Sequence, residues 1–382
     1  MRVPPRGRNL ADALGRLAAG CAFVLALLLH APADAAPRFE VLWKARTAPL
    51  APLAWKPRRQ AEVVLARDGR AVFVAHAGGL MALRSDTGAL LWQAQTGDPV
   101  DATPLERDGR VWAVDTGGAL QAYDRNSGVP LWKEAVALDV AVRAGLRSDA
   151  ERLFLSAESG TLYALAPDTG RVQWRRRMQS GREFLAEGNG APTVRGDLVV
   201  AGASDGQLVV VSARDGGVVW SRDLSGSREG QPDVDTTPVL VGPAGQEMVL
   251  AASHRAGLYA LRLADGDQRW HRPGEGYSTP VVEGERCYTI DGHRALWVLR
   301  WRDGEPLAAR RMASEPTGAI ALHPAGLLVP TGSGITLVRR SDLGTRARLT
   351  DPYGFAAAPT VVGEAIWAIA NDGSVYAMRI HP

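Results

Sequence analysis

The sequence predicts an all-β fold, namely an eight-bladed β-propeller of four-stranded antiparallel blades. Three observations predict it. One phrase recurs along the chain, with the form Gly-x-Leu-x-Ala-Leu, then a turn that contains Gly, then a short strand that carries Trp. The turn glycines recur at intervals of 38 to 50 residues. An incomplete set of strands remains at each end of the chain, and the two sets together make one further blade.

The recurring phrase marks the outer half of each blade. In GTLYALAPDTGRVQW (160–174), a short apolar strand leads into a turn where Gly can take positive φ, and a return strand follows. The other clear copies are 79–92, 119–132, 206–220 and 257–270. Two weaker copies begin at Ala295 and Gly334 and lack the Trp, and Ala308 stands in its place in the first. The predicted turn glycines are Gly88, Gly128, Gly170, Gly216, Gly266, Gly304 and Gly344.

Two shorter strands precede each copy and complete the blade. They recur around a Pro, as in TPVVEGERCYTI (279–290) and APTVVGEAIWAI (358–369). The last copy starts at Gly373 and stops before its fourth strand, while FEVLWKA (39–45) has no strand before it. If this N-terminal strand completes the last blade, the ring closes without an exposed edge and holds eight blades. A ring of seven blades is the alternative.

A Trp stands at the same place in unit after unit. Such a residue is expected to pack between neighbouring blades, because burial of its large ring stabilises their contact. The sequence therefore assigns a structural inter-blade role to Trp43, Trp92, Trp132, Trp174, Trp220 and Trp270. Stacking on a sugar or a base at an exposed site is the alternative.

The first 35 residues have the features of a secretory signal peptide. Arginines precede an apolar run of about 13 residues, and Ala33-Asp34-Ala35 forms a small-x-small cleavage site. The run is shorter than the roughly 20 residues that span a bilayer. The sequence thus predicts a signal at 1–35, a single propeller domain at 36–382 and no transmembrane segment after processing. In a second interpretation Cys21, within LAAGC, is acylated after cleavage before it, although most of the apolar run follows this cysteine.

Composition and charge disfavour several classes of function. Residues 36–382 carry 40 basic and 39 acidic residues with no basic block, so nucleic-acid binding has little support. The histidines are scattered singly, without the spacing of metal ligands, so no metal site and no cofactor are expected. Cys287 lies in an apolar strand and is expected to be a small buried hydrophobic residue.

The repeat resembles the pyrroloquinoline-quinone (PQQ) type of eight-bladed propeller over nearly all of residues 36–382. That family includes quinone-dependent alcohol dehydrogenases and non-enzymatic scaffolds. Two stretches, GAPTVRGDLVVAGASDGQL (190–208) and DVDTTPVLVG (233–242), are similar to the BamB family, scaffolds of outer-membrane β-barrel assembly. The resemblance implies a secreted, periplasmic, non-enzymatic scaffold that binds periplasmic domains of an outer-membrane assembly barrel. Association with the outer membrane is a further option.

The resemblance also implies the partner-binding residues. In the BamB family the Asp-Val-Asp segment and a loop before the Ala-Pro-Thr dock on the central barrel subunit. The residues carried over are Asp233, Asp235, Phe184 and Leu185, and the second loop has Glu187 where the family has a basic residue. Two carboxylates on a crossover loop between blades suit Arg or Lys of a partner. Alternatively, both accept hydrogen bonds from backbone N–H groups of their own loop.

An enzymatic role has less support. Quinone dehydrogenases of this fold are longer chains with an adjacent cysteine pair beside the cofactor and with Glu, Asn and Asp around calcium. Here Cys21 and Cys287 are far apart, and no insert is long enough to cap a quinone. The sequence therefore predicts no enzymatic activity and no catalytic residue. The alternative function is a propeller that binds a quinone or a sugar in its central channel, or a degenerate PQQ-dependent dehydrogenase.

Overall fold

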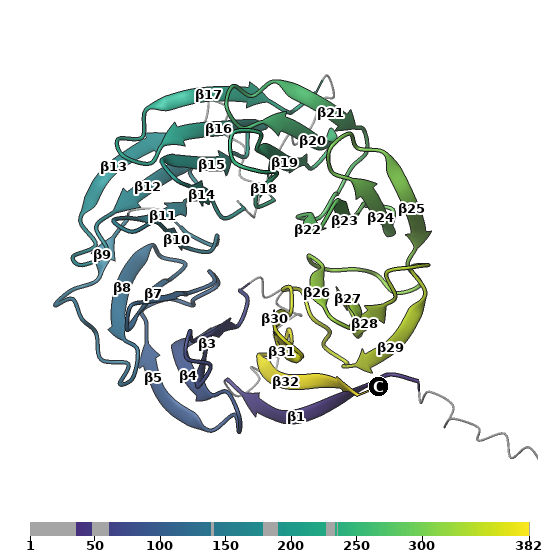
Figure 1. Cartoon of the computed structure of the whole chain (residues 1–382). Coiled ribbons are helices and arrows are strands. Elements are labelled where there is room, and N and C mark those ends of the chain that lie inside the picture. Colours follow the sequence, from purple (N-terminus) through teal and green to yellow (C-terminus); the bar gives the residue numbers. More distant parts are fainter. Residues whose placement is uncertain are drawn as a thin grey trace, which may run out of the picture. The chain divides into compact units, whose positions relative to one another are not determined.

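Short antiparallel strands account for all regular structure in the part of the chain that the structure describes. A computed structural model describes residues 36–47, 61–138, 141–178, 190–226, 234 and 236–381. The strands form eight sheets of four, which follow one another around a central opening (Figure 1). In seven of these sheets the first strand along the chain lies nearest the centre and the last lies on the perimeter; in the eighth, β30 (Thr360–Val362) lies nearest the centre and β1 (Arg38–Arg46) on the perimeter. The all-β prediction and the count of eight blades are confirmed.

Seven blades each use four consecutive strands. Blade 1 comprises β2 (Val64–Leu65), β3 (Ala71–His76), β4 (Gly79–Arg84) and β5 (Leu90–Gln95); blade 2 comprises β6 (Leu105–Arg107), β7 (Arg110–Val114), β8 (Ala119–Asp124) and β9 (Val136–Ala137); blade 3 comprises β10 (Arg147–Ser148), β11 (Leu153–Ser156), β12 (Thr161–Leu165) and β13 (Val172–Arg177). Blade 4 comprises β14 (Thr193–Arg195), β15 (Leu198–Gly202), β16 (Gln207–Ser212) and β17 (Val218–Asp223); blade 5 comprises β18 (Val239–Val241), β19 (Met248–Ser253), β20 (Gly257–Arg262) and β21 (Gln268–Arg272). Blade 6 comprises β22 (Val281–Glu283), β23 (Arg286–Ile290), β24 (Ala295–Arg300) and β25 (Pro306–Arg311); blade 7 comprises β26 (Ala321–His323), β27 (Gly326–Thr331), β28 (Gly334–Val338) and β29 (Thr345–Thr350).

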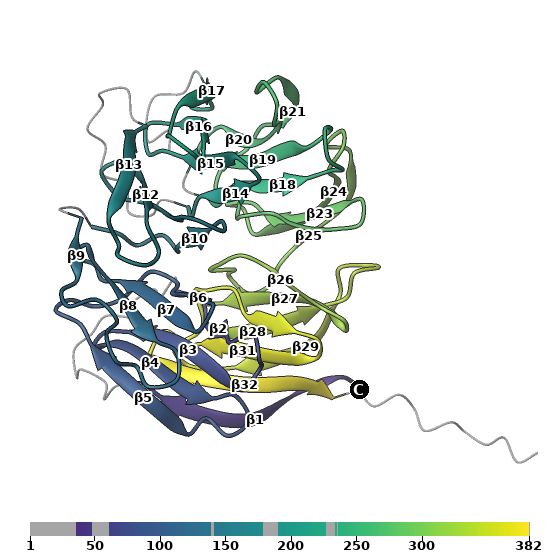
Figure 2. The same cartoon turned by 60° about the vertical axis from the view of Figure 1, so that its left-hand side comes forward.

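Blade 8 joins the two ends of the described chain. Its strands are β30 (Thr360–Val362), β31 (Ala365–Ile369), β32 (Ser374–His381) and β1 (Arg38–Arg46). Strand β1 runs antiparallel to β32 from the pair Arg38 and His381 to the pair Arg46 and Ser374, and the two lie side by side in Figure 2. The prediction that the N-terminal strand completes the last blade is therefore confirmed, and the seven-bladed alternative is wrong.

The core lies between adjacent blades. The middle strands are buried along their length because both faces of each sheet are covered, as β19 and β27 show. One apolar cluster, for example, contains Phe73 and Ala82 of blade 1 with Val111 and Tyr123 of blade 2. The outer strands are mainly exposed; in β17 only Trp220 is buried. Each blade thus needs its neighbours to bury its apolar faces.

Near the perimeter, the same indole contact links six blades to the blades that follow them. The indole N–H donates to a backbone carbonyl in or beside the last turn of the next blade at 2.7 to 2.9 Å. The pairs are Trp43 with Ser85, Trp92 with Arg125, Trp132 with Asp168, Trp174 with Ala213, Trp220 with Leu263 and Trp270 with Trp301. The ring also lies against the turn glycine: a Cβ at Gly128 would be 2.5 Å from Trp92. Both its φ of 70° and the closeness of the indole ring therefore require Gly at position 128.

The contact between blades 6 and 7 uses different residues. Ala308 pairs with Val298 in the register where Trp270 pairs with Ala260 one blade earlier. In the facing turn, Leu343 takes a φ of 57°, and its N–H donates to the Arg339 carbonyl at 3.0 Å, the bond that the turn glycine makes elsewhere. The prediction of Gly344 as the turn glycine is therefore wrong by one residue.

Leu343 has a left-handed backbone conformation because its side chain has a space to fill. It is 3% exposed and packs in one apolar cluster with Ala308, whose small side chain leaves the volume that an indole occupies in other blades. A non-glycine residue in this conformation costs about 1 kcal/mol or more. Burial of an isobutyl group, worth roughly 1.5–3 kcal/mol, offsets that cost.

A polar cluster stands at the seam between blades 7 and 8. The Tyr376 hydroxyl of β32 donates to the carboxylate of Asp351, which follows β29, and the Lys44 ammonium of β1 donates to the same hydroxyl. Lys44 Nζ lies 3.7 Å from Asp351 Oδ2, and the Asp351 side chain is buried. Burial raises the pKa of the Tyr376 hydroxyl, and its bond to Asp351 raises it further. The cluster ties the strand that closes the ring to both of its neighbours.

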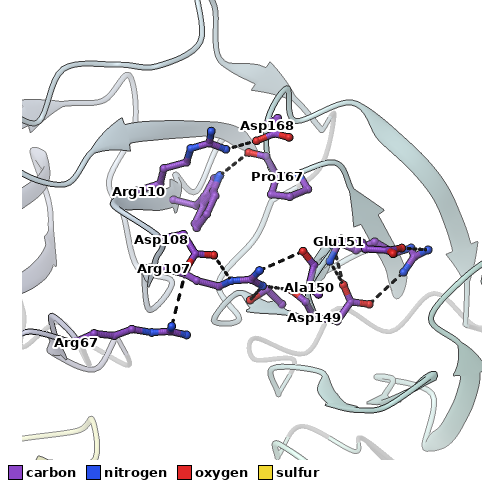
Figure 3. A network of polar contacts seen from close by, with 12 residues as sticks. Arg67, Arg107, Asp108, Arg110, Asp149, Ala150, Glu151, Pro167 and Asp168 are labelled. Carbon is purple, nitrogen blue, oxygen red and sulfur yellow. Dashed lines mark hydrogen bonds and ion pairs between the residues drawn. The ribbon is translucent and has the colours of Figure 1, made fainter.

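A second polar network connects blades 1, 2 and 3 through their first turns (Figure 3). The Arg107 guanidinium donates to Asp108 Oδ2 at 2.7 Å and to the carbonyl oxygens of Asp149 and Ala150 in blade 3. On the other side, Arg67 of blade 1 lies 4.0 Å from Asp108. Exposed pairs of this kind contribute roughly 0–1 kcal/mol each, so the network adds alignment more than stability.

The Leu343 turn gives a testable exchange. Ala308→Trp alone should lower the free energy of unfolding by about 1–3 kcal/mol, because the indole would overpack against Leu343. Adding Leu343→Gly should recover most of this loss, since the pair then reproduces the indole-on-glycine contact of the other blades. Guanidinium unfolding of both single variants and the double variant measures the coupling. Additive effects would contradict the volume exchange.

Candidate functional site

The predicted partner-binding residues Asp233, Asp235, Phe184 and Leu185 lie outside the described residues. The structure does describe the chain on either side of them. The described chain stops at Met178, after the last strand of blade 3, and resumes at Gly190 before blade 4. It stops again at Gly226, after blade 4, and resumes at Thr236 before blade 5, with Val234 described between. The geometry of the site therefore rests on these flanking residues.

The residues at which the chain resumes, Gly190 and Ala191 in one case and Thr236 and Thr237 in the other, contact each other; we call them the return points. The backbone N–H of Ala191 donates to Thr237 Oγ1 at 3.1 Å. A Cβ at Gly190 would lie 2.2 Å from the backbone carbonyl carbon of Thr236, so only glycine allows this approach. The fold thus brings together, at the inner edges of blades 4 and 5, the residues that follow the two predicted docking segments in the sequence.

Val234 anchors the middle of the Asp-Val-Asp segment. It is 0% exposed and packs in a cluster with Leu208 of blade 4 and Tyr259 of blade 5. Its N–H donates to the Ala203 carbonyl at 3.1 Å, and a Cβ at Gly202 would lie 2.4 Å from its carbonyl oxygen. A structural role for this valine was not predicted from the sequence. An apolar residue between two carboxylates was the available signal for an anchor.

Threonines before the first strands link neighbouring blades around the centre. Thr103 Oγ1 accepts from the Glu62 N–H at 3.0 Å, and Thr279 Oγ1 accepts from the Thr237 N–H at 3.3 Å. Together with the bond from Ala191 to Thr237, these contacts satisfy backbone donors that no strand partner reaches. These contacts were not predicted, although Thr-Pro recurs at 103–104, 237–238 and 279–280.

A cavity of about 570 Å³ lies at the centre of the ring, and the return points of both segments line it. Its charges are mixed in sign. Arg143 forms an ion pair with Glu158 at 2.5 Å, and Arg294 lies 3.7 Å from Glu315. The cavity therefore carries internally paired charge, and its lining includes the residues at which the chain resumes after the two predicted docking segments.

Glu62 and Arg147 also line this cavity. Water reaches the Glu62 side chain, yet protein surrounds it, and burial raises the pKa of its carboxyl while the Arg147 charge lowers it in part. Burial also lowers the pKa of the Arg147 guanidinium, and Glu62 opposes this shift. Each group stabilises the charged form of the other across the channel wall.

The residues present do not fit a quinone with calcium. The adjacent cysteine pair of the dehydrogenases has no counterpart, because Cys287 lies fully buried in β23, away from the cavity lining. Burial raises the pKa of its thiol to about 12, so the residue behaves as a small hydrophobic side chain. Across the described ranges, no group of three or more His, Cys, Asp or Glu is placed to hold a metal ion.

Membrane-spanning helices are also absent from the part of the chain that the structure describes: none there has the length and apolar character to cross a bilayer.

Comparisons with known proteins agree with one another on the family. A sequence profile of the family described as outer membrane protein assembly factor BamB matches residues 37–150 and 135–310. The assembly factor BamB of Yersinia pestis is 25% identical over 233 residues, which are 59% of this chain and 58% of that protein. The Escherichia coli K12 protein of the same name is 27% identical over 203 residues, half of each chain. The chain thus spans about half the length of the curated relatives it matches.

Solved structures show the same fold. BamB from Moraxella catarrhalis superposes with a TM-score of 0.76 at 17% identity, covering 89% of this chain and 99% of that one. A europium-containing methanol dehydrogenase superposes with a TM-score of 0.73 at 10% identity, covering 89% of this chain and 93% of that one. At these identities the likeness concerns the fold alone.

Glu62→Gln should stabilise the ring at alkaline pH and leave it unchanged at acid pH. Burial raises the carboxyl pKa above its ordinary value of 4.5, so ionisation disfavours the folded state. Below the unfolded pKa both states are protonated and this cost is absent; it is complete once the pH exceeds the raised folded value. Calorimetric Tm values of variant and wild type should therefore coincide near pH 3.5 and favour the variant at pH 8. A difference that is the same at both pH values would contradict this assignment.

Proposed function

The chain belongs to the family of outer membrane protein assembly factor BamB, and from this premise we propose that it is a non-enzymatic protein-binding scaffold for outer-membrane β-barrel assembly. The observation that carries the proposal is the contact of Gly190 and Ala191 with Thr236 and Thr237, in the lining of the central cavity. It supports two neighbouring docking segments held by rigid blades, an arrangement favoured for recognition.

The proposed site combines charge with apolar contact. Asp233 and Asp235 would pair with Arg or Lys of a periplasmic domain of the assembly barrel, and Phe184 and Leu185 would supply an apolar contact beside them. The buried Val234 between the carboxylates supports this role, because an anchored backbone lowers the entropy that docking costs. Charge pairs of this kind add specificity and association rate more than affinity.

A binding role without catalysis agrees with the channel chemistry. The two relatives described above are named as assembly factors, and two channel arginines lie within ion-pair distance of carboxylates of the chain itself. We propose that the protein works in the periplasm after export, with residues 1–35 as the signal and 36–382 as one propeller domain. Sequencing of the mature N-terminus separates a start at Ala36 from acylation at Cys21.

The docking proposal is tested by charge reversal. Asp233→Lys with Asp235→Lys should reduce capture of a large outer-membrane barrel from the cell envelope at least tenfold, because like charges would then face the partner. Capture by the tagged full chain, followed by mass spectrometry, measures this. The matched control reverses two exposed carboxylates of blades 2 and 6, Glu134 and Glu305.

In the control, capture should equal that of the wild type, and both variants should keep the wild-type Tm. A folded Asp233 and Asp235 variant that captures the barrel as the wild type does would remove this site from the account. A wild-type chain that captures no assembly barrel at all would remove the function.

A further inference from the structure

Charge is distributed unevenly between the perimeter of the ring and the rest of the chain. The outer strands carry thirteen Arg or Lys residues: three each in β1 and β13, one in β17, and two each in β21, β25 and β29. They carry only two carboxylates, Glu40 and Asp223. Residues 36–382 as a whole hold 40 basic and 39 acidic residues. The outer strands themselves are therefore strongly basic in a nearly neutral chain.

Some of these arginines serve the fold. Arg176 Nε donates to the Gly216 carbonyl of the next blade at 2.8 Å, and Arg222 Nε donates to Gly266 in the same way at 3.0 Å. These two side chains lie two residues after the docked Trp and strengthen the same inter-blade contact. Their presence needs no further explanation.

Other perimeter arginines have no such use. Arg310 and Arg311 of β25 and Arg348 of β29 are exposed, and none of the three forms an ion pair or side-chain hydrogen bond with another residue in the described ranges. Three like charges on the outer strands of neighbouring blades bring no ion-pair stabilisation to the ring. A binding role accounts for them better than a structural role.

Exposed aliphatic side chains accompany these charges. Leu307 of β25 is 45% exposed, Leu42 of β1 is 49% exposed and Leu90 of β5 is 58% exposed. Strands β25, β29, β1 and β5 are the outer strands of blades 6, 7, 8 and 1, which are consecutive around the ring (Figure 1). We call these four strands the rim arc. It combines arginines with aliphatic groups on a convex edge.

We propose that the rim arc docks the ring edge-on against a membrane surface rich in anionic phospholipid. Arginine rather than lysine dominates the perimeter, and its planar guanidinium binds phosphate oxygens in pairs. Basic residues interleaved with aliphatic ones are typical of membrane-surface elements. Charges spread over neighbouring strands match a surface of many phosphates better than one shaped ligand. The inference rests on the proposed function, which places the chain at the outer membrane.

Vesicle flotation tests the rim arc directly. The full chain is produced with Cys21→Ser, so that no acyl chain can attach there, and is mixed with vesicles of phosphatidylcholine alone or with 30% phosphatidylglycerol. The arc variant is Arg310→Gln, Arg311→Gln and Arg348→Gln. The matched control, Arg171→Gln, Arg175→Gln and Arg177→Gln, neutralises three exposed arginines of blade 3, which adjoins no blade of the arc.

The protein should bind the anionic vesicles and not the neutral ones, and the binding should weaken as salt rises. Each arginine near an anionic surface changes the partition coefficient about fivefold, so the arc variant should bind about a hundredfold more weakly. The blade 3 control should bind as the parent chain does. Unchanged Tm values show that both variants are folded.

Three results would overturn the proposal: equal binding to both kinds of vesicle, an arc variant that binds like the parent chain, or an equal loss in the blade 3 control. Binding to duplex DNA with the same arc dependence, but not to vesicles, would assign the arc to another polyanion and overturn it too. A failed vesicle experiment would not count against the assembly role, because capture of the outer-membrane barrel is measured separately on the same arc variant.

Discussion

The indole of one blade lying on the turn glycine of the next is the contact on which the ring depends. A four-stranded blade cannot bury both of its faces alone, and this contact fixes how closely two blades approach. Gly128 shows why the contact is selective: its positive φ and the nearby Trp92 ring both exclude a side chain. Leu343 and Ala308 show that what must be preserved is the filled volume, since a small outer-strand residue is matched by a large turn residue.

Much of the fold could be predicted because its signals are local. Turn glycines and short apolar strands recur in most repeats, as does the Trp, and the unpaired strand around Trp43 was enough to predict the closing blade. Leu343 could not be predicted, because a left-handed leucine depends on the space that Ala308 leaves one blade away. Gly190 and Thr237 were missed for a similar reason: each acts through a contact between blades, and in the sequence Gly190 is one glycine among many.

Closure of the ring also leaves two separate surfaces, the lining of the central cavity and the perimeter. The central cavity is lined by the residues that follow both proposed docking segments, and Val234 is fixed between blades 4 and 5. The perimeter holds exposed arginines and leucines on different strands. Under the two proposals, protein binding near the central cavity and lipid binding at the rim arc together hold a partner domain in a defined orientation to the membrane. Neither surface requires the channel to hold a cofactor.

Site-specific photocross-linking in living cells tests the central claim most directly. A photoreactive amino acid is placed at Asp235, with Glu134 of blade 2 as the control position, and the cross-linked products are identified by mass spectrometry. The account predicts that position 235 cross-links to a periplasmic domain of an outer-membrane assembly barrel and that position 134 does not. Cross-links from both positions alike, or from position 235 to an unrelated protein only, would contradict it.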